Sequence, residues 1–365
     1  MGSAVMAHLA DRGLRVIGID RHDVPNDRGS SHGESRVIRT AYFEDPRYVP
    51  LLQRAWQLWE LLGAQVREPL LVETGCLNFG APDHEGVLGA ERAAVQHSLR
   101  YEKLDAAAIA ARFPALRPND GDVGIFERQG GVLAPEACVA GHVMRAVRDG
   151  RGEVRTRERV TSIKADRDSV VVTTERERYE AAACVVATGA WLAAPDSPVR
   201  IPLPLWVERQ VQCWFQVSNP AAYEVGALPC WVRFDGDATF YGMPRHEYPG
   251  VKVCRHHGGA PACADDLDRT ISAQDEETVR SFVRRHLPGA DGPLLAGRVC
   301  MYTNTPDGHF AVGRHPEHER VFVCGGFSGH GFKFAPVIGE AIADLVVDGR
   351  TKLPIELFDP GRAHT

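Results

Sequence analysis

The hydrophobic pattern is clearest in the last quarter of the chain. Residues 321–324 form an apolar run that predicts a buried strand, and a glycine-rich stretch over 325–331 follows it. From Pro336 onward apolar residues recur at helical spacing until Gly349, which predicts a helix with proline in its first turn and glycine at its end. Glycines let a ligand approach the backbone, and a helix amino terminus favours negative charge. This segment is therefore a candidate ligand site, with Lys333 at its opening.

The first twenty residues predict a helix over 4–11 and a strand over 14–20 that ends in a carboxylate. This order is typical of the second half of a dinucleotide-binding βαβ unit. In such a unit Asp20 would accept ribose hydroxyls, and Gly2 would be the last glycine of G-x-G-x-x-G. The first strand and the first two glycines of the motif are not in the sequence. An ordinary helix–glycine–strand turn would give the same pattern, so both interpretations stay open at this point.

Between these ends the periodicity predicts core helices at 48–62 and 135–147, and strands at 154–163 and 169–174. A further buried strand over 182–191 runs into Gly189. A second strand of a nucleotide-binding sheet often meets its ligand at such a turn, although any strand followed by a turn would look the same. The proline-rich stretch 198–204 predicts a crossing between domains.

Three strands are predicted over 230–258, with turns at 235–236 and 249–250. Alternation along the third strand places Lys252, Cys254 and His256 on one face, and Tyr241 lies on the neighbouring strand. A lysine and a histidine on one sheet face are also compatible with simple solvent exposure.

The stretch 29–39, GSSHGESRVIR, concentrates small residues together with His32, Arg36 and Arg39. These residue types suit either a polar surface loop or a corner that binds an anion. The local sequence does not decide between the two.

Composition narrows the classes of function. The 365 residues allow one large or two medium domains, and the net charge of −6 with dispersed basic residues argues against a nucleic-acid partner. No apolar run reaches the roughly eighteen residues of a membrane span, and no signal peptide is recognisable. Nine cysteines without C-x-x-C pairs favour reduced thiols in the cytosol. The fifteen histidines show no metal-ligand spacing, so no metal site is expected.

Four motifs occur in order along nearly the whole chain. They are GSSHGESRVIR followed by YVPL, YGMP with Tyr241 eleven residues before Lys252, CMYTNTPD and GFSGHGFKF. Together they resemble the monomeric sarcosine oxidase and N-methyltryptophan oxidase family, flavoproteins of the glycine/D-amino-acid oxidase group. The resemblance implies an α/β, Rossmann-like FAD-binding domain built from 1–65, 132–195 and 300–365. It also implies an α+β substrate domain, built from 66–131 and 196–299, whose antiparallel sheet covers the flavin.

The resemblance implies roles for individual residues. Cys300, which opens CMYT, matches the cysteine that carries FAD covalently through a thioether. Arg39 and Lys333 match the pair that binds the substrate carboxylate, and Lys252 matches the lysine beside the flavin that assists oxygen activation. The remaining matches are His256 and Tyr241 around the substrate amine, His32 and Arg36 near the isoalloxazine ring, and Gly2, Asp20, Ser30, Gly189 and Gly329 in contact with FAD.

The implied activity is oxidation of a secondary, N-methylated amino acid. The products would be an imine or formaldehyde, the amino acid and hydrogen peroxide. We expect a cytoplasmic monomer whose partners are a small amino acid and O2. Three alternatives remain: an oxidase or dehydrogenase of a cyclic amino acid such as proline or pipecolate, a nicotinamide dehydrogenase, and an inactive flavoprotein remnant. Retention of Lys252 favours an oxidase, and Cys300 has no role in a nicotinamide enzyme.

The first strand of a βαβ unit lies at the centre of its parallel sheet. Without it, two neighbouring strands would lack hydrogen-bond partners. We therefore expect either that the natural chain extends some ten or more residues upstream of Met1, or that the chain folds poorly and binds FAD weakly.

Overall fold

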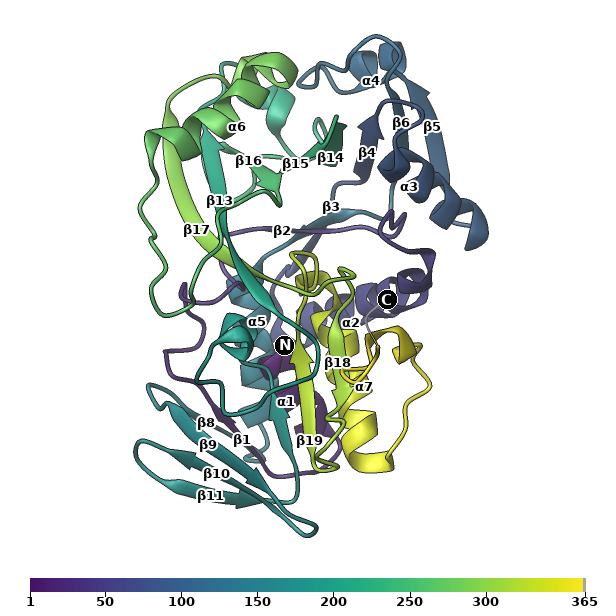
Figure 1. Cartoon of the computed structure of the whole chain (residues 1–365). Helices are drawn as coiled ribbons and strands as arrows, with labels where there is room; N and C mark the ends of the chain where they lie inside the picture. Colours follow the sequence, from purple (N-terminus) through teal and green to yellow (C-terminus); the bar gives the residue numbers. More distant parts are fainter. Residues whose placement is uncertain (364–365) are drawn as a thin grey trace.

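Most strands lie at the two ends of the molecule, and one small three-stranded sheet lies between them (Figure 1). The computed structural model describes residues 1–363. The larger sheet has eight strands in the order β17-β13-β16-β15-β14-β4-β6-β5. Their bounds are β4 Cys76–Gly80, β5 Tyr101–Asp105, β6 Val123–Glu127, β13 Trp206–Phe215, β14 Cys230–Asp235, β15 Ala238–Met243, β16 Val251–His256 and β17 Leu294–Asn304. Neighbours are antiparallel except for the parallel pair β14 and β4.

Helices α3 (Glu85–Gln96), α4 (Ala106–Arg112) and α6 (Ala273–His286) belong to this end of the molecule. The α6 helix begins with a capping box between Ser272 and Asp275. Its Phe282 stacks on Phe240 of β15, with ring centroids 4.0 Å apart, and on Trp231 of β14. This aromatic cluster forms the core of the larger sheet.

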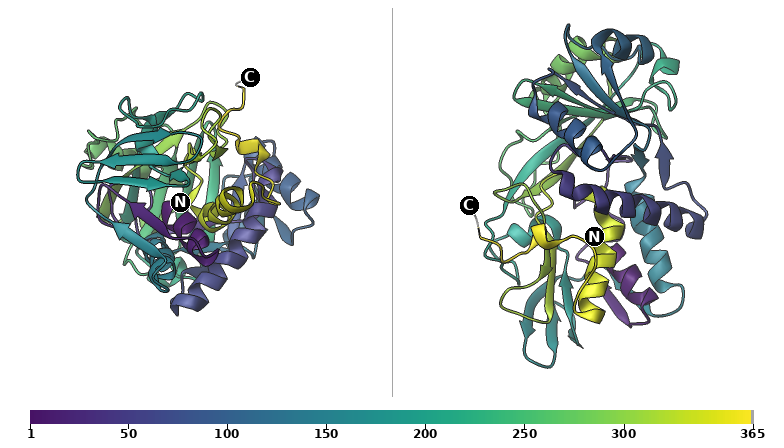
Figure 2. Two further views of the ribbon diagram at one scale, coloured as in Figure 1. Left: turned by 90° about the horizontal axis from the view of Figure 1, so that it is seen from below. Right: turned by 90° about the vertical axis from the view of Figure 1, so that its right-hand side faces the viewer.

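The other end of the molecule has three layers. Its strands are β1 Val16–Ile19 parallel to β8 Gly152–Arg155, and β12 Cys184–Val186 parallel to β19 Val321–Gly325, with β18 Ala311–Arg314 antiparallel to β19. The helices α1 Gly2–Asp11, α2 Val49–Val66, α5 Pro135–Val147 and α7 Ala335–Asp348 gather on one side of these strands (Figure 2). An antiparallel sheet of β9 Val160–Ala165, β10 Val170–Thr174 and β11 Arg178–Ala181 covers the other side.

Side chains of β19 alternate between the antiparallel sheet on one side and the helices on the other. Val321 and Val323 pack with Val170 and Val172 of the antiparallel sheet, whereas Phe322 and Cys324 pack with the helices. Strands β2 Arg36–Ile38, β7 Gly131–Leu133 and β3 Leu71–Glu73 form the small sheet between the two ends. In the described part of the chain there are also six 3-10 helices: η1 Pro46–Tyr48, η2 Gly189–Ala193, η3 Pro220–Tyr223, η4 Pro288–Ala290, η5 Phe332–Phe334 and η6 Glu356–Phe358.

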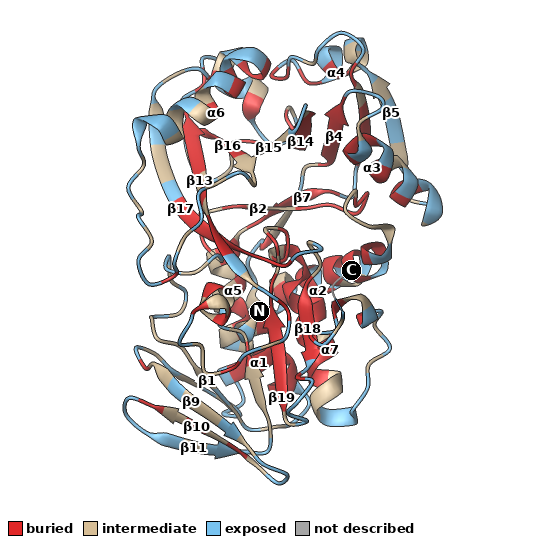
Figure 3. Ribbon diagram, in the orientation of Figure 1, coloured by how far each residue is buried: buried red, intermediate tan, exposed pale blue. Residues whose placement is uncertain are grey.

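The parallel strands do not form one continuous sheet. The pair β8-β1 and the trio β12-β19-β18 are separate, and among residues 1–363 no strand pairs with the second edge of β1 or of β12. Burial reflects this break (Figure 3). Every residue of β19 is buried, whereas Ile17 of β1 is 46% exposed and two of the three β12 residues are only half-buried. Apolar strands in a parallel sheet are normally covered on all sides.

The predicted α/β fold is confirmed, with a Rossmann-like parallel region and a larger, mainly antiparallel sheet. The helices expected at 4–11, 48–62, 135–147 and after Pro336 are all present, with α1 beginning two residues early and α2 ending at Val66. The single strand expected over 154–163 is wrong. Arg157 adopts a left-handed φ of 55° and pairs with Asp23, so the chain turns and enters two different sheets as β8 and β9. The strand expected over 182–191 stops at Val186, because a 3-10 helix starts at Gly189.

Helix α1 packs closely on α7 at Gly339. A Cβ atom at Gly339 would lie 2.8 Å from the backbone carbon of Ala4, closer than real contacts allow. This approach fixes where the amino end of α1 lies relative to the parallel strands.

We expect Gly339→Ala to lower the melting temperature, because the added methyl group meets α1 backbone that cannot rotate away. Overpacking of this kind costs about 1–3 kcal/mol. Gly141→Ala is the matched control in α5, since its Cβ would meet only side-chain atoms at 3.5–3.6 Å. There the better helix propensity of alanine should leave stability unchanged or raise it by up to about 1 kcal/mol. Equal melting temperatures for the two variants would contradict the tight α1–α7 contact.

Candidate active site

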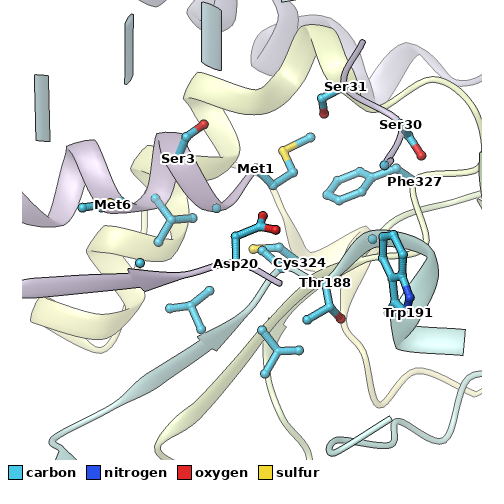
Figure 4. Close-up of a pocket in the computed structure, with 18 of the residues that line it drawn as sticks. Met1, Ser3, Met6, Asp20, Ser30, Ser31, Thr188, Trp191, Cys324 and Phe327 are labelled. Carbon is cyan, nitrogen blue, oxygen red and sulfur yellow. The ribbon is translucent and has the colours of Figure 1, made fainter. Parts of the chain in front are cut away.

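A cavity of about 1240 Å³ runs between the two ends of the molecule. Typical small-molecule pockets have about 300–1,000 Å³, so this one suits a large ligand. Figure 4 shows part of its wall, where Asp20, Ser30, Thr188 and Phe327 approach from separate segments of the chain. The predicted site residues that line it are Gly2, Asp20, Ser30, Arg36, Arg39, Gly189, Tyr241, His256, Cys300, Gly329 and Lys333. His32 and Lys252 are buried beside it and are not part of the lining.

Arg39, just after β2, is a buried cation with a carboxylate partner. Its Nη2 donates to both oxygens of Glu44, at 2.7 and 2.8 Å, and its guanidinium carbon lies 4.3 Å from the Tyr42 ring centroid. Burial opposes the charge of Arg39, but Glu44 outweighs burial and raises the pKa of Arg39. Burial in turn opposes ionisation of Glu44, but Arg39 lowers its pKa below the usual value. The pair is therefore ionised, and the guanidinium is held in a fixed plane.

Lys333 lies on η5, at the start of α7. Its Nζ donates to the carbonyl of His330 at 2.9 Å and lies 5.3 Å from the Tyr42 ring centroid, so Arg39 and Lys333 meet at the same ring. Burial, followed by the charge of Arg39, lowers the pKa of Lys333 to about 7. Near neutral pH this amine therefore gains or loses a proton readily, and a bound anion would favour its charged form.

His330 is a neutral ring close to these two cations. Its Nε2 lies 3.0 Å from the carbonyl of Gly308 and must donate to it, so Nδ1 accepts from the Tyr42 hydroxyl at 2.6 Å. Burial lowers the pKa of His330 to about 4. An uncharged His330 adds no further positive charge beside Arg39 and Lys333.

Lys252 on β16 is buried, whereas a lysine on that strand face was also compatible with solvent exposure in the sequence. Its Nζ donates to the carbonyls of Gly33 and Ser35 at 2.7 and 2.9 Å, and the Trp214 ring centroid lies 4.8 Å away. Burial, followed by the charge of Arg36, lowers the pKa of Lys252 to about 7. The loop of residues 33–35 is thus held against the larger sheet by a lysine.

Arg36 ties the same loop to the cavity. Its two terminal nitrogens donate to the carbonyls of Ser35 and Ser30 at 2.8 and 2.9 Å, and the Ser30 hydroxyl donates to the carbonyl of Met301 at 2.6 Å. His32 lies in this loop, and its Nε2 is buried with no hydrogen-bond partner among the described residues. Burial lowers the pKa of His32 to about 3, so the ring is neutral.

Tyr241, His256 and Tyr302 form an aromatic cluster that lines the cavity. His256 Nδ1 lies 3.2 Å from the Tyr302 hydroxyl, and the Tyr241 ring meets His256 edge-on at 6.1 Å. Burial lowers the pKa of His256 well below its usual value and raises the pKa of Tyr241, so both side chains are uncharged. Cys300 lies on β17 two residues before Tyr302, is 3% exposed and faces the cavity.

Comparison with known proteins identifies the family. A family model described as FAD dependent oxidoreductase matches residues 1–345. The chain is 40% identical over 368 residues to a monomeric sarcosine oxidase from Streptomyces avermitilis, which covers 99% of this chain and 95% of that protein. The chain belongs to the FAD dependent oxidoreductase family. The resemblance carried by the four sequence motifs is thereby confirmed.

Two further relatives agree with this assignment. The chain is 35% identical over 358 residues to an N-methyl-L-tryptophan oxidase from Salmonella arizonae, a match that covers 95% of this chain and 92% of that protein. Among solved structures it is similar to NikD, described as an unusual amino acid oxidase essential for nikkomycin biosynthesis. That match has a TM-score of 0.86 at 26% identity and covers 100% of this chain and 95% of that chain.

The residues around the cavity fit FAD, the cofactor of this family. The Asp20 carboxylate follows β1 at its carboxyl end and points into the cavity, as a ribose ligand should (Figure 4). Gly29 and Gly189 have open space where a side chain would be, so a flat ligand can approach their backbone. Within residues 1–363 no group of histidine, cysteine or acidic side chains is arranged to hold a metal ion. In the same part of the chain no helix has the length and apolar character needed to cross a bilayer.

Several residues that shape this site are not among those predicted from the sequence: Tyr42, Glu44, Glu127, Trp214, Tyr302 and His330. Glu44 and Tyr42 follow Arg39 within five positions, so a carboxylate and a ring close to a candidate anion-binding arginine were a usable signal. Glu127 gave none, because it lies 87 positions from the loop that it holds.

Glu127, at the end of β6, is buried and accepts hydrogen bonds from three donors, two backbone N–H groups and one hydroxyl. The N–H groups of Thr40 and Ala41 lie 2.9–3.0 Å from its oxygens, and the Thr40 hydroxyl also donates to it. Burial, only partly offset by these donors, raises the pKa of Glu127 to about 6. The carboxylate therefore fixes the backbone directly after Arg39.

We expect Glu127→Gln to destabilise the protein by about 1–3 kcal/mol. The glutamine NH2 group would face the N–H groups of Thr40 and Ala41, so two hydrogen-bond donors would meet without an acceptor. Because the folded-state pKa of Glu127 is raised, its contribution to stability falls as pH rises through about 6. The melting-temperature difference between the native chain and the variant should therefore grow as pH falls from 7 to 5. Parallel melting curves across that range would show that the Glu127 carboxyl does not titrate there.

Proposed function

We propose that the protein is an FAD-dependent oxidase of secondary, N-methylated amino acids, similar in activity to sarcosine oxidase. The observation that carries this proposal is the pair of buried cations, Arg39 and Lys333, which both line the cavity and both contact the Tyr42 ring. Two adjacent cations bind a carboxylate through charge-assisted hydrogen bonds, each worth roughly 1.5–3 kcal/mol. Relatives named for sarcosine and for N-methyl-L-tryptophan support a secondary amine as the reacting group.

The cations would orient the substrate by its carboxylate. Glu44 already holds Arg39 in place, and one of the three Lys333 donors reaches His330, which leaves donors for a ligand. The uncharged His256 and Tyr302, which line the same cavity, would face the amine. A neutral imidazole can accept a hydrogen bond from that amine and does not repel its protonated form.

Bound FAD supplies the two-electron acceptor, and molecular oxygen finally takes two electrons and two protons to give hydrogen peroxide. The substrate loses two electrons and two protons and becomes an imine. When the N-methyl carbon is the one oxidised, the product is an N-methylene imine, which water hydrolyses to formaldehyde and the amino acid. Lys252 would favour the oxygen reaction, because a buried ammonium stabilises negative charge that develops on oxygen. Its pKa of about 7 means that the charge is partly present at neutral pH.

We also propose the boundaries of the two domains. The FAD-binding unit would comprise 1–65, 132–195 and the chain from about 305, and the substrate domain would comprise 66–131 and 196–304. The expected boundary at 300 moves because β17 runs from Leu294 to Asn304 within the eight-stranded sheet. Residues 364 and 365, at the end of the expected domain, lie outside the described part of the chain.

The proposal includes a monomer in the cytoplasm whose partners are a small amino acid and O2, with no nucleic acid and no membrane. Nine free cysteines, most of them buried, suit a reducing compartment. The word monomeric in the names of the sarcosine oxidase relatives supports the oligomeric state.

Oxygen uptake tests the proposed activity. We expect peroxide formation with N-methyl amino acids and at least tenfold lower kcat/KM with the matching N-methyl amino amides, which lack the carboxylate that Arg39 and Lys333 would bind. Activity that is indifferent to the carboxylate, or confined to cyclic amino acids such as proline, would refute the proposed substrate class.

The pH dependence isolates Lys333. Acetate has a carboxylate and no amine, so its inhibition constant should rise as pH increases from about 7 to 9, when the Lys333 ammonium loses its proton. Lys333→Met should bind acetate weakly and without this pH dependence. Lys252→Met should retain most of it, since Lys252 is bonded to the carbonyls of Gly33 and Ser35.

We propose that FAD is attached covalently through Cys300, a buried thiol that faces the cavity beside Tyr302. The native protein should keep its yellow colour after acid precipitation, whereas Cys300→Ser should release any flavin into the supernatant. Cys324→Ser is a suitable control, because Cys324 is also buried at the cavity but belongs to β19. Complete loss of flavin from the native protein in acid would refute the attachment.

A further inference from the structure

Three side chains form an apolar part of the cavity wall next to the cations. They are Phe43, Val232 and Tyr241, and all three line the cavity. Val232 on β14 and Tyr241 on β15 are register partners, so they project from the same face of the eight-stranded sheet. Phe43 and Tyr241 both pack against the buried hydrophobic cluster that contains Val232. We call these three residues the side-chain subsite.

Phe43 connects the side-chain subsite to the cation that would bind the substrate carboxylate. The guanidinium carbon of Arg39 lies 4.1 Å from the centroid of the Phe43 ring. A carboxylate oxygen accepts from a guanidinium N–H group at about 2.9 Å. The α-carbon attached to that carboxylate would therefore lie close to the Phe43 ring, and a side chain on this carbon would reach the subsite.

Helix α3 and strand β14 hold Phe43 in place. Its ring meets the Phe234 ring edge-on, with the centroids 4.9 Å apart. A Cβ atom at Gly89 of α3 would lie 2.6 Å from the carbonyl oxygen of Phe43, and one at Gly86 would lie 2.2 Å from the Phe234 ring. These glycines let α3 approach both phenylalanines closely, which leaves the two residues little room to move. The subsite therefore has a fixed shape before a ligand binds.

The surroundings of the subsite disfavour a charged side chain on the substrate. Both oxygens of Glu44, the residue after Phe43, already accept from Arg39. Burial raises the pKa of Tyr241, so its hydroxyl keeps its proton. Thr239 adds a hydroxyl to the lining, which can bond an uncharged group but cannot neutralise a charge. A charge brought from water into such surroundings is costly unless it finds a partner of opposite sign.

We propose that the side-chain subsite receives an apolar side chain on the α-carbon of the substrate. The enzyme would then prefer N-methylated amino acids with side chains such as that of leucine to sarcosine, which has none. This preference rests on the proposed function, because it takes the secondary amine and the carboxylate of the substrate as given. A side chain in the subsite would remove the apolar surfaces of Phe43 and Val232 from water, whereas sarcosine would leave them exposed.

Binding of simple carboxylates to the purified holoenzyme tests the subsite without any reaction. Acetate, 4-methylpentanoate, glutarate and 6-aminohexanoate correspond to glycine, leucine, glutamate and lysine without the α-amine. Titration calorimetry should show that 4-methylpentanoate binds at least tenfold more tightly than acetate, because its branched chain is removed from water. Glutarate and 6-aminohexanoate should bind no more tightly than acetate, since each brings a charge to the subsite.

Variants locate the preference. Val232→Thr keeps the shape of the side chain and adds a hydroxyl, so it should reduce the tenfold preference for 4-methylpentanoate to threefold or less and leave acetate binding unchanged. Phe43→Ala removes one wall of the subsite and should also reduce the preference. Val253→Thr is the matched control, because Val253 is buried with the α6 cluster on the opposite face of the same sheet. It should keep the preference of the native protein.

Equal affinities of the native protein for acetate and 4-methylpentanoate would overturn the proposal, as would tighter binding of either charged chain. An unchanged preference in Val232→Thr would also overturn it, and this variant decides the question even if Phe43→Ala is insoluble. Oxygen uptake is measured separately, and N-methyl-L-leucine should have a kcat/KM at least tenfold above that of sarcosine.

The two measurements separate the subsite from the proposed function. Tight binding of 4-methylpentanoate without oxidation of any N-methyl amino acid would retain the subsite and refute the proposed function. A kcat/KM for sarcosine equal to or above that for N-methyl-L-leucine would retain the proposed function and overturn the subsite.

Discussion

Burial of positive charge around one cavity is the constraint on which the rest of the site depends. Arg39, Lys252 and Lys333 are each less than a tenth exposed, and Arg36 lies beside them. A buried cation is costly unless it is paired, so each needs a partner from the protein or from a ligand. Glu44 supplies a full negative charge to Arg39, whereas the two lysines have carbonyl partners and lowered pKa values. The site therefore holds latent positive charge that an anionic substrate or a negatively charged reaction product would stabilise.

The connectivity of the chain explains how these cations meet. Arg39 follows a strand of the small sheet, Lys333 precedes α7 and Lys252 lies in the eight-stranded sheet. Contacts between the segments lock them together: Glu127 holds the backbone after Arg39, and Lys252 holds the loop before it. Contacts with Glu127 and Lys252 thus hold residues 33–44 in place. A stretch rich in small and polar residues, which would suit an exposed loop, therefore has a fixed position beside the cavity.

The local hydrophobic pattern was sufficient to predict most helices and strands, and which residues share one face of a strand. The 3.6-residue period located α2, α5 and α7, and alternation placed Lys252 and His256 on one face of β16, whereas the burial of Lys252 did not follow from the pattern. The local pattern failed at Arg157, where a residue with left-handed φ interrupts an apparently continuous strand, because nothing in the neighbouring sequence favours a turn there. The hydrogen-bond partners of the site residues could not be predicted from the sequence either. Glu127 and Thr40 are 87 positions apart, and tertiary packing alone brings them together. Residue roles came from the motifs, since a lysine and a histidine on one strand face fit exposure equally well.

The two halves of the cavity differ in how completely the described chain builds them. Arg39 and Lys333 both have hydrogen-bond partners within the chain, and the glycines at 326, 329 and 331 are in close contact with neighbouring side chains. Around Asp20, strands with apolar sequences are half-exposed and Gly189 faces open space. Packing density in protein interiors leaves few voids of this size. The end that would recognise the substrate is therefore preorganised by the chain itself. Around Asp20 the described chain leaves space for a ligand, so a ligand bound there would add to the stability of the folded state.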